Sequence, residues 1–343
     1  MIHLKIRIKG ACLYVCHYCL YEPPEHVREY LEAEAEIHVV RPNKERDKFM
    51  ELLPKADALI GAGLPVEREL LDNAPGLRVV SNASAGVDNL DLDLLTERGI
   101  TVTNTPAAVV DTMADTMFGL MIGASRRLME MHELVKSGQW DRNAPKEWFG
   151  LNVHHKKLGI IGMGGIGKEI ARRAKEGFRM EVSYYNRSRH EEAERETGAV
   201  YEQLDDLLAS SDVVMVLLPL TEQTKHMLGT EAFRKMKSTA VFLNGGRGSV
   251  VDEQALITAL QEKEIFAAGL DVFEEEPLPA DHPFLAMPEV TVLPHIGTGT
   301  TETREAMYME AAAQCVKALR GEKPEALVNK KVWNEGSRQQ FKK

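Results

Sequence analysis

Cysteine and long apolar runs are both scarce in this sequence. Four cysteines in 343 residues are too few for the disulfide framework of a small secreted domain. The longest apolar runs, such as 213–220, fall well below the ~18 residues that a membrane-spanning helix needs. Near the start, Lys5, Arg7 and Lys9 alternate with Ile and Leu, which interrupts the apolar core of a signal peptide. We therefore expect a cytoplasmic protein without membrane contact.

Positive charge is also in short supply, because 42 Lys and Arg stand against 52 Asp and Glu, a net charge of −10. Nucleic acids and anionic membranes are bound through basic surfaces, so neither is an expected partner. The remaining composition, 44% apolar and 27% charged, is typical of globular proteins. The length suits about two domains.

Three of the four cysteines, Cys12, Cys16 and Cys19, gather in the sequence CLYVCHYC. Their C-x3-C-x2-C spacing resembles the 4Fe–4S cluster motif of radical S-adenosylmethionine enzymes. The same run has the apolar, β-prone composition of a strand, which would direct Cys12 and Cys16 to one face and Cys19 to the other. A strand is the favoured interpretation, and we expect no metal site.

Short β-prone runs alternate with helical stretches along the chain. The strands expected in the first half are 14–21, 36–41, 57–64, 77–84 and 100–105, and those in the second half are 157–163, 181–186, 212–219, 239–245, 266–273 and 290–296. Several of the later runs are almost entirely apolar, as in parallel strands buried on both faces. This alternation predicts an α/β protein with two doubly wound parallel-sheet domains.

One long helical stretch, Ala107 to Ser137, separates the two halves. Met113, Met117 and Met121 recur on it every four residues, which places them on one helix face. We predict a buried connecting helix with these methionines in the core. At the other end of the chain, the polar residues 334–343 are expected to form a disordered tail.

A glycine-rich turn follows the first strand of the second half. Gly162, Gly164 and Gly167 form a G-x-G-x-x-G pattern between that strand and a helix. Such glycines allow a tight turn, close approach of a pyrophosphate and close helix–strand packing, and the free N–H groups of the helix start attract phosphates. A purely structural turn is the alternative. We predict dinucleotide binding at Gly162, Gly164, Gly165, Ile166 and Gly167.

The end of the next strand indicates which dinucleotide is bound. Asn186, Arg187 and Ser188 stand about twenty positions after the turn, where NAD-binding proteins carry a carboxylate for the ribose hydroxyl. Arginine can instead pair bidentately with a 2′-phosphate, and serine can add a hydrogen bond. We predict that NADP(H) is preferred, with NAD(H) as the second cofactor. A solvated arginine on a loop is the alternative.

Three later strands are each followed by a side chain suited to 2-oxo acid reduction: Arg247, Glu276 and His295. Ligands bind at the carboxyl ends of parallel strands, so the three are expected to converge there. The arginine would pair with the substrate carboxylate and the histidine would protonate the carbonyl oxygen. The glutamate would hold the histidine in its protonated form.

Several segments together resemble one family. GMGGIG, NGGRGSVVDEQAL, AAGLDVFEEEPLP and LPHIGTGTTETR are similar to the signature segments of the D-isomer-specific 2-hydroxyacid dehydrogenases. Within that family the chain is most similar to glyoxylate/hydroxypyruvate reductases and 2-ketogluconate reductases, over about residues 20–330. Gly165 departs from the pattern, since many members carry arginine there.

The resemblance implies further site residues and an organisation. Ala85, Gly86 and Val87 would offer backbone amides to the substrate carboxylate, and the cofactor would be lined by Leu218, Pro219, Asn244, Gly245, Gly246 and Asp271. A Rossmann cofactor domain of 105–295 would be inserted in the sequence between the two segments, 1–104 and 296–330, of a flavodoxin-like substrate domain. A cleft would lie between the two domains. Members of the family are usually homodimers.

The leading expectation is NAD(P)H-dependent reduction of glyoxylate, hydroxypyruvate or 2-keto-gluconate to the D-2-hydroxy acid. One alternative is an NAD-dependent dehydrogenase of the phosphoglycerate type, which often has a further C-terminal regulatory domain. The other is a corepressor-like protein that senses a dinucleotide without catalysis, because a fold and its site can be reused. The acidic composition disfavours that second alternative.

Overall fold

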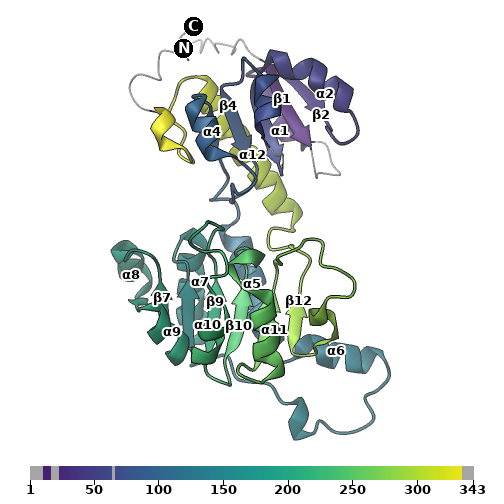
Figure 1. Cartoon of the computed structure of the whole chain (residues 1–343), viewed down its shortest axis with the longest axis vertical. Coiled ribbons are helices and arrows are strands. Elements are labelled where there is room, and N and C mark those ends of the chain that lie inside the picture. The colour runs from purple at the N-terminus through teal and green to yellow at the C-terminus, as the bar shows by residue number, and fades with distance from the viewer. Residues whose placement is uncertain (1–10, 17–22, 64–65, 334–343) are drawn as a thin grey trace. The chain divides into compact units, whose positions relative to one another are not determined.

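The computed structural model describes residues 11–16, 23–63 and 66–333 of the chain. These residues form two compact units, one within Met1–Val109 and Thr300–Lys343 and the other spanning Val110–Gly299 (Figure 1). Each unit contains one sheet whose strands all pair in parallel, so the predicted parallel α/β class is confirmed. The assignment of a substrate domain and a cofactor domain stays a prediction.

The first unit has a five-stranded sheet in the order β2-β1-β3-β4-β5, which is the strand order of flavodoxin-like folds. Its strands are β1 (Ala11–Cys16), β2 (Glu36–Val40), β3 (Ala56–Ala62), β4 (Val79–Asn82) and β5 (Thr101–Thr103). Its helices are α1 (Glu25–Glu32), α2 (Arg46–Leu52), α3 (Arg68–Asp72), α4 (Leu92–Glu97) and α12 (Thr301–Leu319). The last helix returns to this sheet from the far end of the sequence (Figure 1).

Both faces of the first sheet are covered by packed side chains. Successive strand residues point to opposite faces, so adjacent residues enter different core clusters. Leu59 and Val80 pack in one core cluster, whereas Ile60 and Val79 pack in another with the buried face of α12. The hydroxyl of Ser81 in β4 donates to the carbonyl of Ala311 in α12 at 2.8 Å. The C-terminal helix is therefore an integral layer of this unit.

Strand β1 contains Cys12 and Cys16, and it pairs with β2 and β3 inside the sheet. Cys19 lies outside the described residues, as does the expected tail 334–343. Within the described part of the chain, no group of three or more His, Cys, Asp or Glu could hold a metal ion. The described part of the cysteine run thus has the strand structure expected from its composition.

The second unit has a seven-stranded sheet in the order β12-β11-β10-β9-β6-β7-β8. Its strands are β6 (Lys157–Ile161), β7 (Glu181–Tyr185), β8 (Val200–Tyr201), β9 (Val213–Val216), β10 (Val241–Asn244), β11 (Ala267–Leu270) and β12 (Val290–Val292). Its helices are α5 (Val110–Ser125), α6 (Leu128–Lys136), α7 (Gly165–Phe178), α8 (Glu191–Thr197), α9 (Leu204–Ser210), α10 (Thr230–Lys235) and α11 (Glu253–Gln261). Only the short edge strand β8 has no counterpart among the predicted strands.

The predicted single helix over 107–137 is wrong. Helix α5 ends at Ser125 and α6 begins at Leu128, because Arg127 between them adopts a left-handed φ of 54°. The carbonyl of Ser125 accepts instead from the N–H of Leu151 at 2.7 Å, so a returning segment closes the end of α5. Helix α5 is buried as expected, but α6 has no buried residue.

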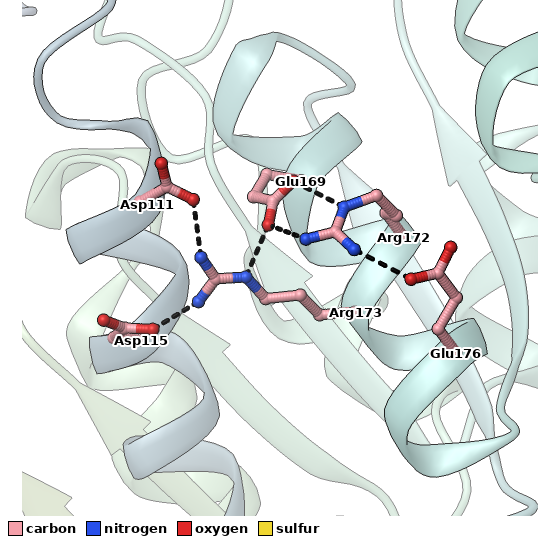
Figure 2. Close-up of polar contacts among 6 residues, drawn as sticks. All are labelled: Asp111, Asp115, Glu169, Arg172, Arg173 and Glu176. Carbon is pink, nitrogen blue, oxygen red and sulfur yellow. Dashed lines mark hydrogen bonds and ion pairs between the residues drawn. The ribbon is translucent and has the colours of Figure 1, made fainter.

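An ion-pair network fastens α5 to α7 (Figure 2). The guanidinium of Arg173 in α7 bonds Asp111 at 2.6 Å and also reaches Asp115, both in α5. Within α7, Glu169 accepts from Arg172 and Arg173, each at 2.6 Å. The hydrogen bond from Arg172, with a smaller contribution from Arg173, lowers the pKa of Glu169 to about 2. The network therefore fixes α5 against α7, the helix that begins at Gly165 within the glycine-rich turn.

Candidate active site

The glycine-rich turn connects β6 to α7 in a way that only glycine permits at two positions. Gly162 has a φ of 112°, and a Cβ there would lie 2.9 Å from the backbone of Leu217. A Cβ on Gly167 would lie 2.6 Å from the carbonyl oxygen of Gly162. The amides of Gly165 and Ile166 have no acceptor among the described residues, and no side chain caps the helix. The turn therefore presents free N–H groups at a helix start, which fits a pyrophosphate.

Asn186, Arg187 and Ser188 follow β7 directly beside this turn. The side-chain oxygen of Asn186 accepts from the N–H of Met163 at 2.8 Å, which ties the end of β7 to the turn. Arg187 and Ser188 are exposed and have no side-chain partner in the described part of the chain. The next arginine, Arg189, is bound by both carboxylate oxygens of Glu194 at 2.7 Å. Of the two arginines Arg187 and Arg189, Arg187 is therefore the one whose side chain can bind a ligand without breaking an ion pair.

The loop after β10 is folded by Asn244. Its amide oxygen accepts from Gly246 at 3.0 Å, and its amide nitrogen donates to the carbonyl of Arg247 at 3.1 Å. A Cβ on Gly246 would lie 2.6 Å from the carbonyl oxygen of Leu218, so this loop lies against the segment after β9. A Cβ on Gly245 would lie 2.3 Å from the sulfur of Met117 in α5. Met117, one of the three regularly spaced methionines, therefore packs against this loop.

Glu276 and His295 form a hydrogen-bonded pair in the second unit. Oε2 of Glu276 lies 2.7 Å from Nδ1 of His295, and Oε1 accepts from the N–H of Phe273 at 3.0 Å. Burial alone would raise the pKa of Glu276, but the hydrogen bonds from His295 and Phe273 and the nearby charges of His295 and Arg247 outweigh it and lower that pKa. Glu276 is therefore an ionised acceptor at neutral pH. Nδ1 carries the hydrogen, so Nε2 is the nitrogen left to exchange a proton with a ligand.

Two backbone arrangements fix this pair. Asp271 at the end of β11 is buried, and its two oxygens accept from Ile296 at 2.8 Å and Gly297 at 2.9 Å. The loop that carries His295 is thereby anchored to the neighbouring strand. A Cβ on Gly248 would lie 1.8 Å from the carbonyl carbon of Phe273. The loop after Arg247 therefore packs directly against the backbone that leads to Glu276.

The structure thus brings Arg247, Glu276 and His295 to the carboxyl edge of one sheet. Asp271 was predicted to line the cofactor, and its anchoring of the His295 loop is a contact that the sequence did not indicate. The contact of Gly248 was also missed, although a glycine directly after Arg247 was a signal of close backbone packing. His282, which is close to Glu276 in the sequence, bonds Glu253 at 3.3 Å.

Ala85, Gly86 and Val87 lie in the first unit, in the loop after β4. All three are half-buried, and their N–H groups have no acceptor among the described residues. Their carbonyl oxygens, in contrast, all accept hydrogen bonds. The loop therefore has the free donors that the predicted carboxylate contact requires, while the contact itself stays a prediction.

No helix in the described part of the chain is both long and apolar enough to cross a membrane.

Comparison with known proteins identifies the family to which the second unit belongs. The sequence pattern described as "D-isomer specific 2-hydroxyacid dehydrogenase, NAD binding domain" matches residues 118–297. Glyoxylate/hydroxypyruvate reductase B of Yersinia pestis is 48% identical over 285 residues, which are 83% of this chain and 87% of the relative.

Solved structures agree with this match. A glyoxylate reductase from Paecilomyes thermophila has a TM-score of 0.83 and 33% identity, covering 93% of this chain and 98% of that one. An NADPH-dependent glyoxylate/hydroxypyruvate reductase from Sinorhizobium meliloti, solved with NADP and malonate, has a TM-score of 0.81 and 28% identity, covering 94% and 97%. The chain therefore belongs to the D-isomer-specific 2-hydroxyacid dehydrogenases, a family of oxidoreductases that act on CH–OH groups.

Proposed function

We propose that this enzyme reduces a small 2-oxo acid, such as hydroxypyruvate, glyoxylate or 2-keto-gluconate, to the 2-hydroxy acid, with the D configuration where the product is chiral. The observation that carries the proposal is the 2.7 Å contact between Glu276 and His295. It lies on the same sheet as the glycine-rich turn and beside the loop of Arg247. A general acid, a carboxylate-binding cation and a dinucleotide turn on one sheet suit 2-oxo acid reduction.

The roles of the three side chains follow from their contacts. A bound nicotinamide supplies the hydride for the carbonyl carbon. His295 gives the proton on Nε2 to the carbonyl oxygen, while Glu276 at Nδ1 fixes the ring and stabilises its charged form. Arg247 pairs with the substrate carboxylate and polarises the carbonyl group. For that carboxylate we also propose the backbone amides of Ala85, Gly86 and Val87.

We propose NADP(H) as the preferred cofactor and NAD(H) as the second. Arg187 and Ser188 are exposed beside the glycine-rich turn, and the related Sinorhizobium meliloti enzyme was solved with NADP. Arg187→Asp is expected to raise the KM for NADPH much more than the KM for NADH, because the new carboxylate repels a 2′-phosphate. Arg195→Asp on α8 makes the same charge change at another exposed arginine and serves as the control. Equal losses with both cofactors would contradict the assignment.

We further propose that 105–295 binds the cofactor, that 1–104 with 296–330 binds the substrate, and that the enzyme is a homodimer. The support for the dimer is an exposed apolar segment on and after α6, made of Leu128, Met129, Val135, Trp140 and Phe149. Trp140 is 64% exposed, far more than a side chain of this size retains in a core. Val135→Glu should lower the mass measured by light scattering to that of a monomer. An unchanged dimer would place the interface elsewhere.

We place the reaction in the cytoplasm. Four cysteines in 343 residues are too few for a disulfide framework, as is usual for cytoplasmic proteins. A reductase also needs a pool of reduced nicotinamide dinucleotide, which the cytoplasm maintains. Cell fractionation followed by activity measurement tests this location, and activity confined to another compartment would contradict it.

The deciding experiment is a panel of 2-oxo acids measured with both cofactors. The proposal predicts that hydroxypyruvate, glyoxylate or 2-keto-gluconate is reduced at the expense of NADPH. Oxidation of 3-phosphoglycerate with NAD, without reduction of those acids, would indicate a phosphoglycerate-type enzyme. Dinucleotide binding without turnover of any acid would indicate a sensor protein.

A further inference from the structure

The loop after β4 has an unusually one-sided pattern of backbone hydrogen bonds. Four successive carbonyl oxygens accept: Ser84 from the N–H of Thr105 at 3.0 Å, Ala85 from the side chain of Asn104 at 2.7 Å, Gly86 from the side chain of Asn82 at 2.7 Å, and Val87 from the N–H of Leu90 at 3.0 Å. The N–H groups of Ala85, Gly86 and Val87 have no acceptor within the described part of the chain. All the acceptors in this stretch are therefore used and three donors are left.

This pattern gives the loop the chemistry of an anion site. A buried or half-buried backbone N–H needs a partner, which water or a ligand must supply when the protein does not. Successive free N–H groups form a small electropositive surface that suits a carboxylate or phosphate oxygen. Because Ala85, Gly86 and Val87 are only half-buried, a ligand can reach them.

Two asparagines determine which way these N–H groups point. In a planar peptide, the carbonyl of one residue and the N–H of the next point in opposite directions. Asn104 holds the carbonyl of Ala85, so the N–H of Gly86 points away from the Asn104 amide. Asn82 holds the carbonyl of Gly86, so the N–H of Val87 points away from the Asn82 amide. The donors of Gly86 and Val87 thus each depend on one side-chain amide, whereas the N–H of Ala85 follows the carbonyl of Ser84, which the backbone of Thr105 holds.

The fold explains why both asparagines reach this loop. Asn82 is the last residue of β4, and Asn104 directly follows β5. The two strands are parallel neighbours, with Val79 opposite Thr101, so their carboxyl ends meet at one edge of the sheet. Asn82 is 2% exposed, which leaves it little freedom to turn elsewhere. Neither asparagine belongs to the glycine-rich turn or to the group of Arg247, Glu276 and His295.

We propose that Asn82 and Asn104 are positioning residues that aim the amides of Gly86 and Val87 at the substrate carboxylate. The inference rests on the proposed 2-oxo acid reduction, in which that loop binds the carboxylate. The amide side chain is suited to this task because it donates without charge. An aspartate in its place would turn a carboxylate, which cannot donate, toward the carbonyl that it should hold, and would add a negative charge near the anion site.

The test compares Asn104→Ala, Asn104→Asp and Asn82→Ala with Asn73→Ala. Asn73 is a matched control, since its side chain also donates to a carbonyl, that of Glu69 at 2.8 Å, at an exposed helix end of the same unit. Asn104→Ala and Asn82→Ala are each expected to raise the KM for the 2-oxo acid about tenfold, the worth of one hydrogen bond to a charged group. Asn104→Asp should raise it further, while the KM for NADPH stays as in the control.

Binding of malonate, measured by calorimetry on the full chain, separates this inference from the proposed function. If the wild type reduces 2-oxo acids but the Asn82 and Asn104 variants keep the KM of the control, the positioning role is overturned. It is also overturned if the KM for NADPH rises in step with that for the acid, or if only Tm falls. If the wild type reduces no 2-oxo acid, the proposed function fails. Weaker malonate binding in the Asn82 and Asn104 variants than in the Asn73 control would then still support the positioning role, and equal binding would overturn it. Should Asn82→Ala fail to fold, the less buried Asn104 variants decide.

Discussion

Glu276→Gln tests the electrostatic core of the mechanism with a change that keeps the shape of the side chain. Glutamine preserves an oxygen acceptor for the N–H of Phe273, which the carboxylate binds at 3.0 Å. It removes the negative charge that lies 2.7 Å from Nδ1 of His295. The protonated form of His295 would lose its counter-charge, while the packing of the loop would change little.

The size of the effect follows from the geometry. Two unit charges about 4 Å apart attract by about 4 kcal/mol at an effective dielectric constant of about 20. The side chains of Glu276 and His295 are 35% and 48% exposed, so solvent screening reduces this to at most about 1 kcal/mol. Because one pH unit corresponds to about 1.4 kcal/mol, the alkaline limb of kcat/KM should move to lower pH by about half a unit.

On the acid side of the pH profile, the group that titrates is Glu276. The pKa of Glu276 is lowered, so the ionised carboxylate contributes above its ordinary titration range and is lost only as pH falls through the lowered value. Between that value and the alkaline limb the wild-type pair is complete. The assay is kcat/KM for 2-oxo acid reduction across this range, with Glu275→Gln as control, because that neighbouring carboxylate is exposed. An unchanged alkaline limb in Glu276→Gln, or an equal shift in Glu275→Gln, would mean that Glu276 does not stabilise the protonated form of His295.

Three further changes test the site. His295→Ala should lower kcat by ~10²–10⁴-fold, the usual worth of a general acid, and near-wild-type turnover would remove it from the proton-donor role. Arg247→Ala should raise the KM for the 2-oxo acid as well as lower kcat, whereas an unchanged KM would mean that another group binds the carboxylate. Gly248→Ala places a Cβ 1.8 Å from the carbonyl carbon of Phe273, so the free energy of unfolding should fall by about 3 kcal/mol. Gly177→Ala, with nothing within 4 Å, is its control in a denaturation assay, and equal stability of the two variants would contradict the packing.

Much of the fold could be predicted because its signals are local. The apolar strands of the second unit and the glycines at 162 and 167 mark a buried parallel sheet and a tight turn directly in the sequence. The break between α5 and α6 could not be predicted in this way. It depends on the left-handed Arg127, with no glycine or proline to signal it, and on the distant Leu151 that bonds Ser125.

The site shows the same division between local and tertiary signals. Arg247, Glu276 and His295 were chosen because each follows a strand, and parallel strands end at a common edge. Asn82 and Asn104 were not chosen, because their hydrogen bonds to Gly86 and Ala85 depend on the register between β4 and β5. Polar side chains that hold a loop carbonyl have no sequence pattern of their own, so only the folded structure reveals them.

The most direct test of 2-oxo acid reduction is the consumption of NADPH by the wild-type chain with hydroxypyruvate or glyoxylate, together with the configuration of the product. We expect saturable consumption with at least one of these acids, D-glycerate as the product from hydroxypyruvate, and loss of turnover in His295→Ala. Consumption of NADPH no faster than without protein, by a chain that binds NADPH, would contradict it. So would formation of the L isomer.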